Sequence, residues 1–248
     1  MPTHHNDFRP GVTLVARMMG AISLLIRNAS VMHSTAPRSN GPLDRVIIHA
    51  DRALRTLAAE PAGSGRESPA RGVDDEELSA AERRLAGALM RVDHAGEVAA
   101  QALYHGHAAT ARRDGVRRAM EQAAREEGDH LAWCRERLRE LGARRSYLDP
   151  VWYAGSFAIG ALTGLAGERW SLGFVAETER QVVDHLDQHL RRLPPGDHRG
   201  RAILAQMRED EGRHATTAAR EGGADLPGPL PRIMRQVAKL MTRGAEWI

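Results

Sequence analysis

The stretches REEGDHLAW (residues 125–133) and REDEGRHAT (residues 208–216) decide the fold, because each carries a Glu-x-x-His pattern. On a helix, residues three apart lie on one face, so the glutamate and histidine of each copy could bind the same metal ion. One copy alone is a weak signal, because such a short pattern also arises by chance. The residues concerned are Glu127 and His130 in the first copy, and Glu211 and His214 in the second.

A further glutamate precedes each copy at nearly the same distance. Glu97, in RVDHAGEVAAQALY, lies 30 residues before Glu127, and Glu179, in GFVAETERQVVDHL, lies 32 residues before Glu211. This spacing suits two antiparallel helices whose side chains lie at equal height above their turn, since a helix rises about 1.5 Å per residue. Two such hairpins bring four glutamates and two histidines to one level, the ligand set of carboxylate-bridged di-iron or di-manganese bundles. We therefore expect an all-α, ferritin-like four-helix bundle.

Charge and position select among the neighbouring acidic residues. Four carboxylates in a bundle core would be strongly destabilising without two divalent cations to balance them. Glu177 and Glu179 lie about 200° apart around a helix, so only one can face the core, and the spacing favours Glu179. Glu126 and Glu209 are expected to be solvated.

The remaining histidines are expected to be surface or hydrogen-bonded residues and not ligands. His185 is the one we expect to lie near the site, as an outer-sphere or substrate-contacting group. Asp93, one turn before Glu97, is a candidate for orienting a ligand imidazole, because metal-bound histidine usually donates its other N–H group. The other histidines in this group are His94, His105, His107 and His189.

Composition favours a helical chain in a reducing compartment. The 248 residues are 42% hydrophobic and 27% charged, and β-branched runs are scarce. Cys134 is the single cysteine, so it cannot form an internal disulfide. The net charge of +3 comes from scattered arginines and not from a basic block, so we expect no nucleic-acid partner, whereas anionic lipid headgroups would suit such a surface.

Capping and breaking signals delimit the helices and the domain. Ser79-x-x-Glu82 is a capping box that opens the first bundle helix, and Asp114 is a candidate N-cap for the second. We expect a mobile extension over residues 1–40 and a ferritin-like domain over residues 41–248, with a disordered Pro/Gly/Ser linker at 61–77. The expected helices start near residue 42, then span 79–112, 114–142, 170–193 and 197–222, with an amphipathic helix from 231 to 248.

The stretch PVWYAGSFAIGALTGLAG (residues 150–167) contains no charged residue. A single membrane crossing here would leave Glu179 on the opposite side of the bilayer from Glu97, so the ligands could not meet. A ferritin-like bundle needs a long crossover at this position, and an apolar crossover would lie against a membrane surface. The alternative is a buried helix or a dimer contact, in which Gly160 and Gly164 allow close helix approach.

The segments RVDHAGEVAA, EEGDH, FVAETERQVVDHL and EDEGRH, in this order and spacing, resemble the demethoxyubiquinone hydroxylase family of ubiquinone biosynthesis. The resemblance covers roughly residues 42–248. It implies O₂-dependent hydroxylation of the benzoquinol ring of a polyprenylated 3-methyl-6-methoxy-1,4-benzoquinol at two iron ions, and the choice of iron over manganese rests on it. One ion would be held by Glu97, Glu127 and His130 and the other by Glu179, Glu211 and His214, with Glu127 and Glu211 bridging.

The resemblance also implies a location and partners. The protein would be peripheral and monotopic on the cytoplasmic face of the cell membrane, where the polyprenyl quinol is embedded. A homo-oligomer or a complex with other ubiquinone-biosynthesis proteins stays open. Since no Gly-rich dinucleotide fingerprint is found, the electrons would come from the quinol, from NADH bound without a Rossmann fold, or from a partner protein.

Two other classes of protein compete with this interpretation. An iron-storage or peroxide-scavenging protein of the ferritin or rubrerythrin type would use the same six ligands, but it has no need of an apolar crossover. A metal-free helical interaction protein would need none of the six ligands.

Overall fold

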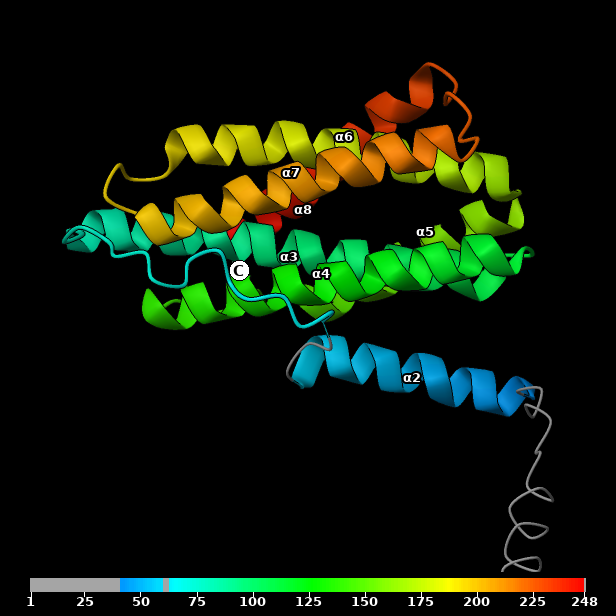
Figure 1. The fold of residues 1–248 in the computed structure, drawn as a ribbon, viewed down its shortest axis with the longest axis horizontal. Coiled ribbons are helices and arrows are strands. Elements are labelled where there is room, and N and C mark those ends of the chain that lie inside the picture. Colours follow the sequence, from blue (N-terminus) through cyan, green and yellow to red (C-terminus); the bar gives the residue numbers. More distant parts are fainter. Residues whose placement is uncertain (1–40, 60–62, 248) are drawn as a thin grey trace, which may run out of the picture. The chain divides into compact units, whose positions relative to one another are not determined.

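The computed structural model describes residues 41–59 and 63–247, and every regular element in these ranges is a helix (Figure 1). The all-α prediction is therefore confirmed, while the predicted extension over residues 1–40 lies outside the described residues. The chain separates into two units, residues 1–46 and 47–248, and the described part of the first is the start of α2. The helices are α2 (Pro42–Ala58), α3 (Ala80–Thr110), α4 (Asp114–Glu140), α5 (Asp149–Leu165), α6 (Glu168–Arg192), α7 (His198–Arg220) and α8 (Pro229–Trp247).

Four of these helices form the predicted bundle from two hairpins. α3 pairs with α4 and α6 pairs with α7, and the hairpins meet where α4 packs on α7 and α3 on α6 (Figure 1). α5 joins the second bundle helix to the third and lies along α3. This order is that of a ferritin-like bundle, in which a long connection separates the two hairpins.

Local signals explain where the bundle helices begin. Ser79 caps α3, since its hydroxyl accepts from the N–H of Glu82 while the Glu82 carboxylate accepts from the N–H of Ser79. Asp197 caps α7 by accepting from the N–H of Gly200 at 2.7 Å. Asp114 was predicted to be an N-cap, but it is the first residue of α4 and the preceding residue provides no side-chain cap.

Two apolar clusters fill the bundle, and each bundle helix passes from one cluster to the other. Between the clusters, all four helices carry polar side chains at the same level. One cluster includes Leu89, Met90, Trp133, Leu138, Leu186, Ile203 and Met207. The other includes Tyr104, Met120, Ala124, Leu172, Val175 and Ala218. Burial of these two clusters is what holds a polar layer inside the bundle.

Glycines let α5 lie against α3. A Cβ atom at Gly160 would clash with the carbonyl oxygen of Leu103, and one at Gly164 would clash with Thr110. The Gly-x-x-x-Gly pattern therefore serves a contact within this chain. Across the described residues, no helix is both long enough and apolar enough to cross a membrane.

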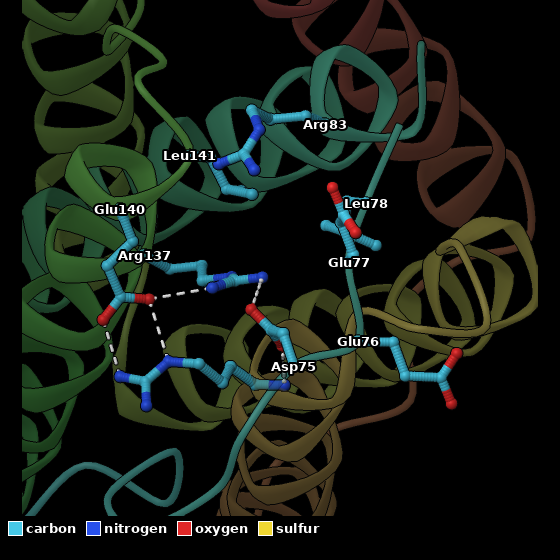
Figure 2. A pocket seen from close by; sticks show the side chains of 9 residues that line it. Asp75, Glu76, Glu77, Leu78, Arg83, Arg137, Glu140 and Leu141 are labelled. Atoms are coloured by element: carbon cyan, nitrogen blue, oxygen red, sulfur yellow. Dashed lines mark hydrogen bonds and ion pairs between the residues drawn. The ribbon is translucent and has the colours of Figure 1, made fainter. Parts of the chain in front are cut away.

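The segment expected to be a disordered linker makes specific contacts over residues 63–77, while residues 61 and 62 lie outside the described residues. Asp75 accepts from the backbone N–H of Arg199 at 2.9 Å and pairs with Arg137 at 2.7 Å. Figure 2 shows Arg137 between Asp75 and Glu140, and Glu140 in turn pairs with Arg199 at 2.6 Å. These pairs attach the segment to α4 and α7, because Arg137 is buried and needs its acidic partners.

Candidate metal centre

The polar layer between the two apolar clusters contains all six residues predicted to bind metal. Five of them are buried, with at most 3% of the residue exposed, and the side chain of the sixth, His214, is 11% exposed. α3 and α6 contribute one glutamate each, whereas α4 and α7 contribute one Glu-x-x-His pair each. The residues are Glu97, Glu127, His130, Glu179 and Glu211, with His214.

Three carboxylates surround one ring nitrogen of His130. Its Nδ1 lies 3.3 Å from Glu97 Oε2, 3.1 Å from Glu127 Oε2 and 3.1 Å from Glu211 Oε1. One donor atom from each of these four residues lies within 4.8 Å of the others. This is a compact set of oxygen and imidazole ligands of the kind that iron and manganese accept.

Glu127 and Glu211 each approach both histidines through different oxygen atoms. Glu127 places Oε1 3.4 Å from His214 Nδ1, and Glu211 places Oε2 3.2 Å from the same nitrogen. The other oxygen of each carboxylate faces His130. A carboxylate shared in this way between two ligand sets is placed to bridge two metal ions.

Glu179 completes the layer from α6. Its side chain is fully buried, and its Oε1 accepts a hydrogen bond from the Tyr104 hydroxyl at 2.7 Å. Glu177 faces elsewhere, since it accepts from Gln181 at 2.7 Å and lies 3.6 Å from Arg180. The structure therefore places Glu179, and not Glu177, in the bundle core.

Each of the two histidines contacts a carboxylate from the other hairpin. His130 Nε2 on α4 lies 3.0 Å from Asp210 Oδ2 on α7, and His214 Nε2 on α7 lies 2.8 Å from Glu126 Oε2 on α4. We call Asp210 and Glu126 the outer carboxylates. With a metal ion bound at Nδ1, each ring would donate its Nε2–H to the outer carboxylate beside it, which would fix the tautomer of the ligand.

Two predictions about these positions were wrong. Glu126 was expected to be solvated but contacts His214 with a side chain only 23% exposed, whereas Glu209 is exposed as predicted. Asp93 was expected to orient a ligand imidazole, but it contacts His185 and His189 on α6 instead. The outer carboxylates share one signal in the sequence, since each directly precedes the glutamate of a Glu-x-x-His pair, but helix packing decides which histidine each one meets.

Asp210 is also contacted by the segment of residues 63–77, which precedes α3. Arg66 pairs with Asp210 Oδ2 at 2.7 Å, and its guanidinium lies 5.0 Å from the Trp133 ring centroid. Arg213 and Gln206 donate to the other oxygen of Asp210 at 2.5 Å and 3.0 Å. Because the segment around Arg66 was predicted to be disordered, this contact was not predicted.

Burial and mutual repulsion disfavour negative charge in this layer. Burial, reinforced by the charges of Glu127 and Glu211, raises the pKa of Glu97 and Glu179 well above its usual value. Burial would lower the pKa of His130, but the carboxylates of Asp210, Glu127, Glu211 and Glu97 outweigh it and raise that pKa strongly.

The carboxylate oxygens fit a pair of divalent cations. Glu127, Glu179 and Glu211 each have one buried oxygen that accepts no hydrogen bond. A buried oxygen of this kind is costly unless a cation or a donor meets it. Two divalent ions would meet these oxygens and balance the four carboxylates.

The pocket drawn in Figure 2 has a different chemistry. Its walls include Asp75, Arg137, Glu140 and Arg199, whose charges are paired with one another. None of the six predicted ligands lines it. The carboxylate layer inside the bundle is therefore the better candidate for the functional site.

The chain matches a known family and named relatives over most of its length. Residues 84–245 match the model of the family described as ubiquinone biosynthesis protein COQ7. The 3-demethoxyubiquinol 3-hydroxylase of Nitrosococcus oceani is 59% identical over 206 residues, which are 83% of this chain and 96% of that protein. The protein of the same name from Nitrosomonas europaea is 53% identical over 83% of this chain and 99% of its own length. That from Chromobacterium violaceum is 54% identical over 81% of this chain and 97% of its own length.

Proposed function

The chain belongs to the COQ7 family of ubiquinone biosynthesis proteins, and we propose that it is a 3-demethoxyubiquinol 3-hydroxylase that works at two iron ions held by the buried carboxylate layer. The observation that carries the proposal is the convergence of four glutamates and two histidines at one level of the bundle. Relatives with this name match the chain over most of both lengths. They give no support to the iron-storage or peroxide-scavenging alternative.

The iron pair would supply the activation of O₂. One oxygen atom would enter the quinol ring, and the other would be reduced to water by two electrons and two protons. The protein's part is to hold the ligands and exclude water. Glu127 and Glu211 would bridge the ions, and Asp210 and Glu126 would fix the tautomers of the two histidines. Tyr104 would hold Glu179 in place through its hydroxyl.

The source of the two electrons is the quinol, NADH or a partner protein. The sequence carries no Gly-rich dinucleotide fingerprint, so NADH would have to bind without a Rossmann fold. We propose NADH as the donor to test first, with a partner protein as the other source. Oxidation of NADH that depends on O₂ and on the quinol would support this assignment, and no oxidation above the iron-free protein would contradict it.

An apolar face of α5 supports a peripheral position on the membrane. The face opposite α3 exposes Val151, Ile159, Leu162 and Leu165, and α5 has no charged residue apart from buried Asp149. A polyprenyl tail is insoluble in water, so an enzyme for this substrate benefits from lying where the tail is dissolved. We propose that this face enters the headgroup region on the cytoplasmic side of the cell membrane.

The last helix supports the same position. Ile233, Val237 and Leu240 are exposed along one side of α8, at the spacing of successive helical turns. The other side carries Arg235, Lys239 and Arg243, which are also exposed. An apolar stripe opposite a basic one is typical of a helix that lies in a membrane interface.

The hydroxylase proposal is tested by a matched pair of variants on α7. Glu211→Gln removes a proposed bridging ligand, whereas Glu209→Gln changes an exposed glutamate two residues away. In a strain blocked at quinone-ring hydroxylation, the wild type and Glu209→Gln are expected to restore ubiquinone, and Glu211→Gln is expected to fail. Purified wild type should hold two iron ions per chain. Failure of the wild type, or rescue by Glu211→Gln, would refute the assignment.

The membrane proposal has its own test in vesicle flotation. Leu162→Glu places a charge on the exposed α5 face and is expected to reduce binding to anionic vesicles. Leu85→Glu, at a partly exposed position on α3, is the control and should bind as the wild type does. Equal flotation of the wild type and Leu162→Glu would contradict the placement of this face.

A further inference from the structure

A second group of metal-ligating side chains lies outside the proposed iron site. It consists of Asp93 on α3 with His185 and His189 on α6, whose donor atoms lie within 4.8 Å of one another. Asp93 precedes Glu97 by one turn, roughly 6 Å along α3, and His185 follows Glu179 by roughly 9 Å along α6. The three side chains therefore lie apart from the carboxylate layer, at the level of the apolar cluster that contains Leu186.

The distances within this group fit ligands of one metal ion. His189 Nδ1 lies 2.7 Å from Asp93 Oδ1, and His185 Nε2 lies 3.5 Å from the same oxygen. Two ligands each about 2.1 Å from a zinc ion are roughly 3.0–3.4 Å apart in octahedral or tetrahedral geometry. One observed distance lies just below that range and the other just above it, so small side-chain shifts would bring the three ligands around one ion. Histidines four residues apart on a helix also present both rings to one side.

The contacts are poor as hydrogen bonds, although the atoms are close. His189 Nδ1 and both oxygens of Asp93 are buried and form no hydrogen bond, so the short Nδ1–Oδ1 contact lacks the required angle. The Asp93 side chain is fully buried and faces the two imidazoles, and a buried carboxylate needs a positive charge beside it, which either a protonated histidine or a metal ion would supply.

His185 gives the group access to solvent. Its side chain is 28% exposed, whereas the side chains of Asp93 and His189 are 0% and 4% exposed. A metal ion could therefore enter from the His185 side and keep water in its remaining positions. Two imidazoles and one carboxylate with open positions suit a first-row divalent ion such as Zn²⁺.

We propose that Asp93, His185 and His189 bind one divalent transition-metal ion, separate from the iron pair, and that this ion links α3 to α6. The alternative is a simple aspartate–histidine ion pair that helps the two helices pack. The two differ in a measurable way, because an ion pair takes up no metal. The proposal does not depend on the hydroxylase function.

The test uses the full-length, iron-loaded chain, to which Zn²⁺ is added before free ions are removed and both metals are counted. The wild type is expected to gain one zinc ion per chain while keeping its iron. His185→Gln and His189→Gln each remove a ligand, so zinc affinity should fall at least about 100-fold, more than the usual effect of losing an outer partner. His198→Gln, which changes a half-exposed histidine on α7 outside this group, is the matched control and should bind zinc normally.

Thermal unfolding gives a second measurement. At a zinc concentration 100-fold above Kd, the Tm of the iron-loaded wild type should rise by roughly 5–10 °C, and that of His185→Gln should not. Because His185 is partly exposed, its variant carries the test even if His189→Gln fails to fold. The proposal is overturned if the wild type gains no zinc at millimolar concentration, if zinc replaces an equal amount of iron, or if His185→Gln binds zinc like the wild type.

Discussion

Replacing Asp210 by Asn tests whether the outer carboxylates control the metal centre. Asp210 is fully buried, and its Oδ2 lies 3.0 Å from Nε2 of His130, the imidazole whose Nδ1 faces three glutamates. An asparagine oxygen could still accept the hydrogen bond, but the negative charge that makes the imidazole a stronger ligand would be lost. The substitution therefore changes the centre without removing a ligand.

The size of the effect follows from burial. Loss of an outer partner costs about 10–100-fold in metal affinity, which corresponds to about 1.4–2.8 kcal/mol. We expect Asp210→Asn near the upper end, since no water can replace a carboxylate in a fully buried position. Glu126→Gln should lie near the lower end, because that side chain is 23% exposed and solvent can take over part of its role.

The assay is competition for Fe²⁺ between the protein and a chelator of known affinity, with Glu209→Gln as the control. Glu209 is exposed and directly precedes Asp210, so its substitution should leave iron affinity unchanged. Circular dichroism of each iron-free variant checks that the helices are intact. If Asp210→Asn binds iron as tightly as Glu209→Gln, the assigned role of the outer carboxylates is wrong.

Three further outcomes are expected. Tyr104→Phe removes the donor to Glu179 and should weaken iron binding about tenfold in the same chelator assay, with unchanged binding as the contrary result. Burial lowers the pKa of His107 from 6.5 to about 4, so between these pH values the unfolded chain binds more protons than the folded chain, and about 3 kcal/mol of unfolding free energy should be lost as the pH falls from 6.5 to 4. Urea unfolding at the two pH values should show a smaller loss for His107→Gln than for the wild type, and an equal loss would contradict this. Gly160→Ala should lower Tm because its Cβ would meet the α3 backbone, whereas Gly155→Ala, on the open side of the same helix, should raise Tm slightly; the reverse order would show that α5 packs differently.

The sequence by itself determined the helical class, the bundle and the set of candidate ligands. Apolar periodicity and the Ser79 capping box are local, so they can be read without the fold. The spacing from Glu97 to Glu127 and from Glu179 to Glu211 is also sufficient, because a helix converts residue number into height along its axis. For that reason the level at which the six candidate ligands meet was predictable.

Tertiary structure decided which side chains meet across helices. The contacts of Asp210 with His130 and of Glu126 with His214 depend on how α4 is rotated against α7. The docking of Arg66 onto Asp210 depends on packing of a segment whose composition resembles a flexible linker. Likewise, Asp93 meets His185 and not one of the two candidate ligand histidines. The reason is that core packing, and not spacing along one chain, sets which sides of α3 and α6 face each other. Residue spacing fixes how far along a helix axis a side chain lies, but only packing fixes how the helix is rotated against its neighbours.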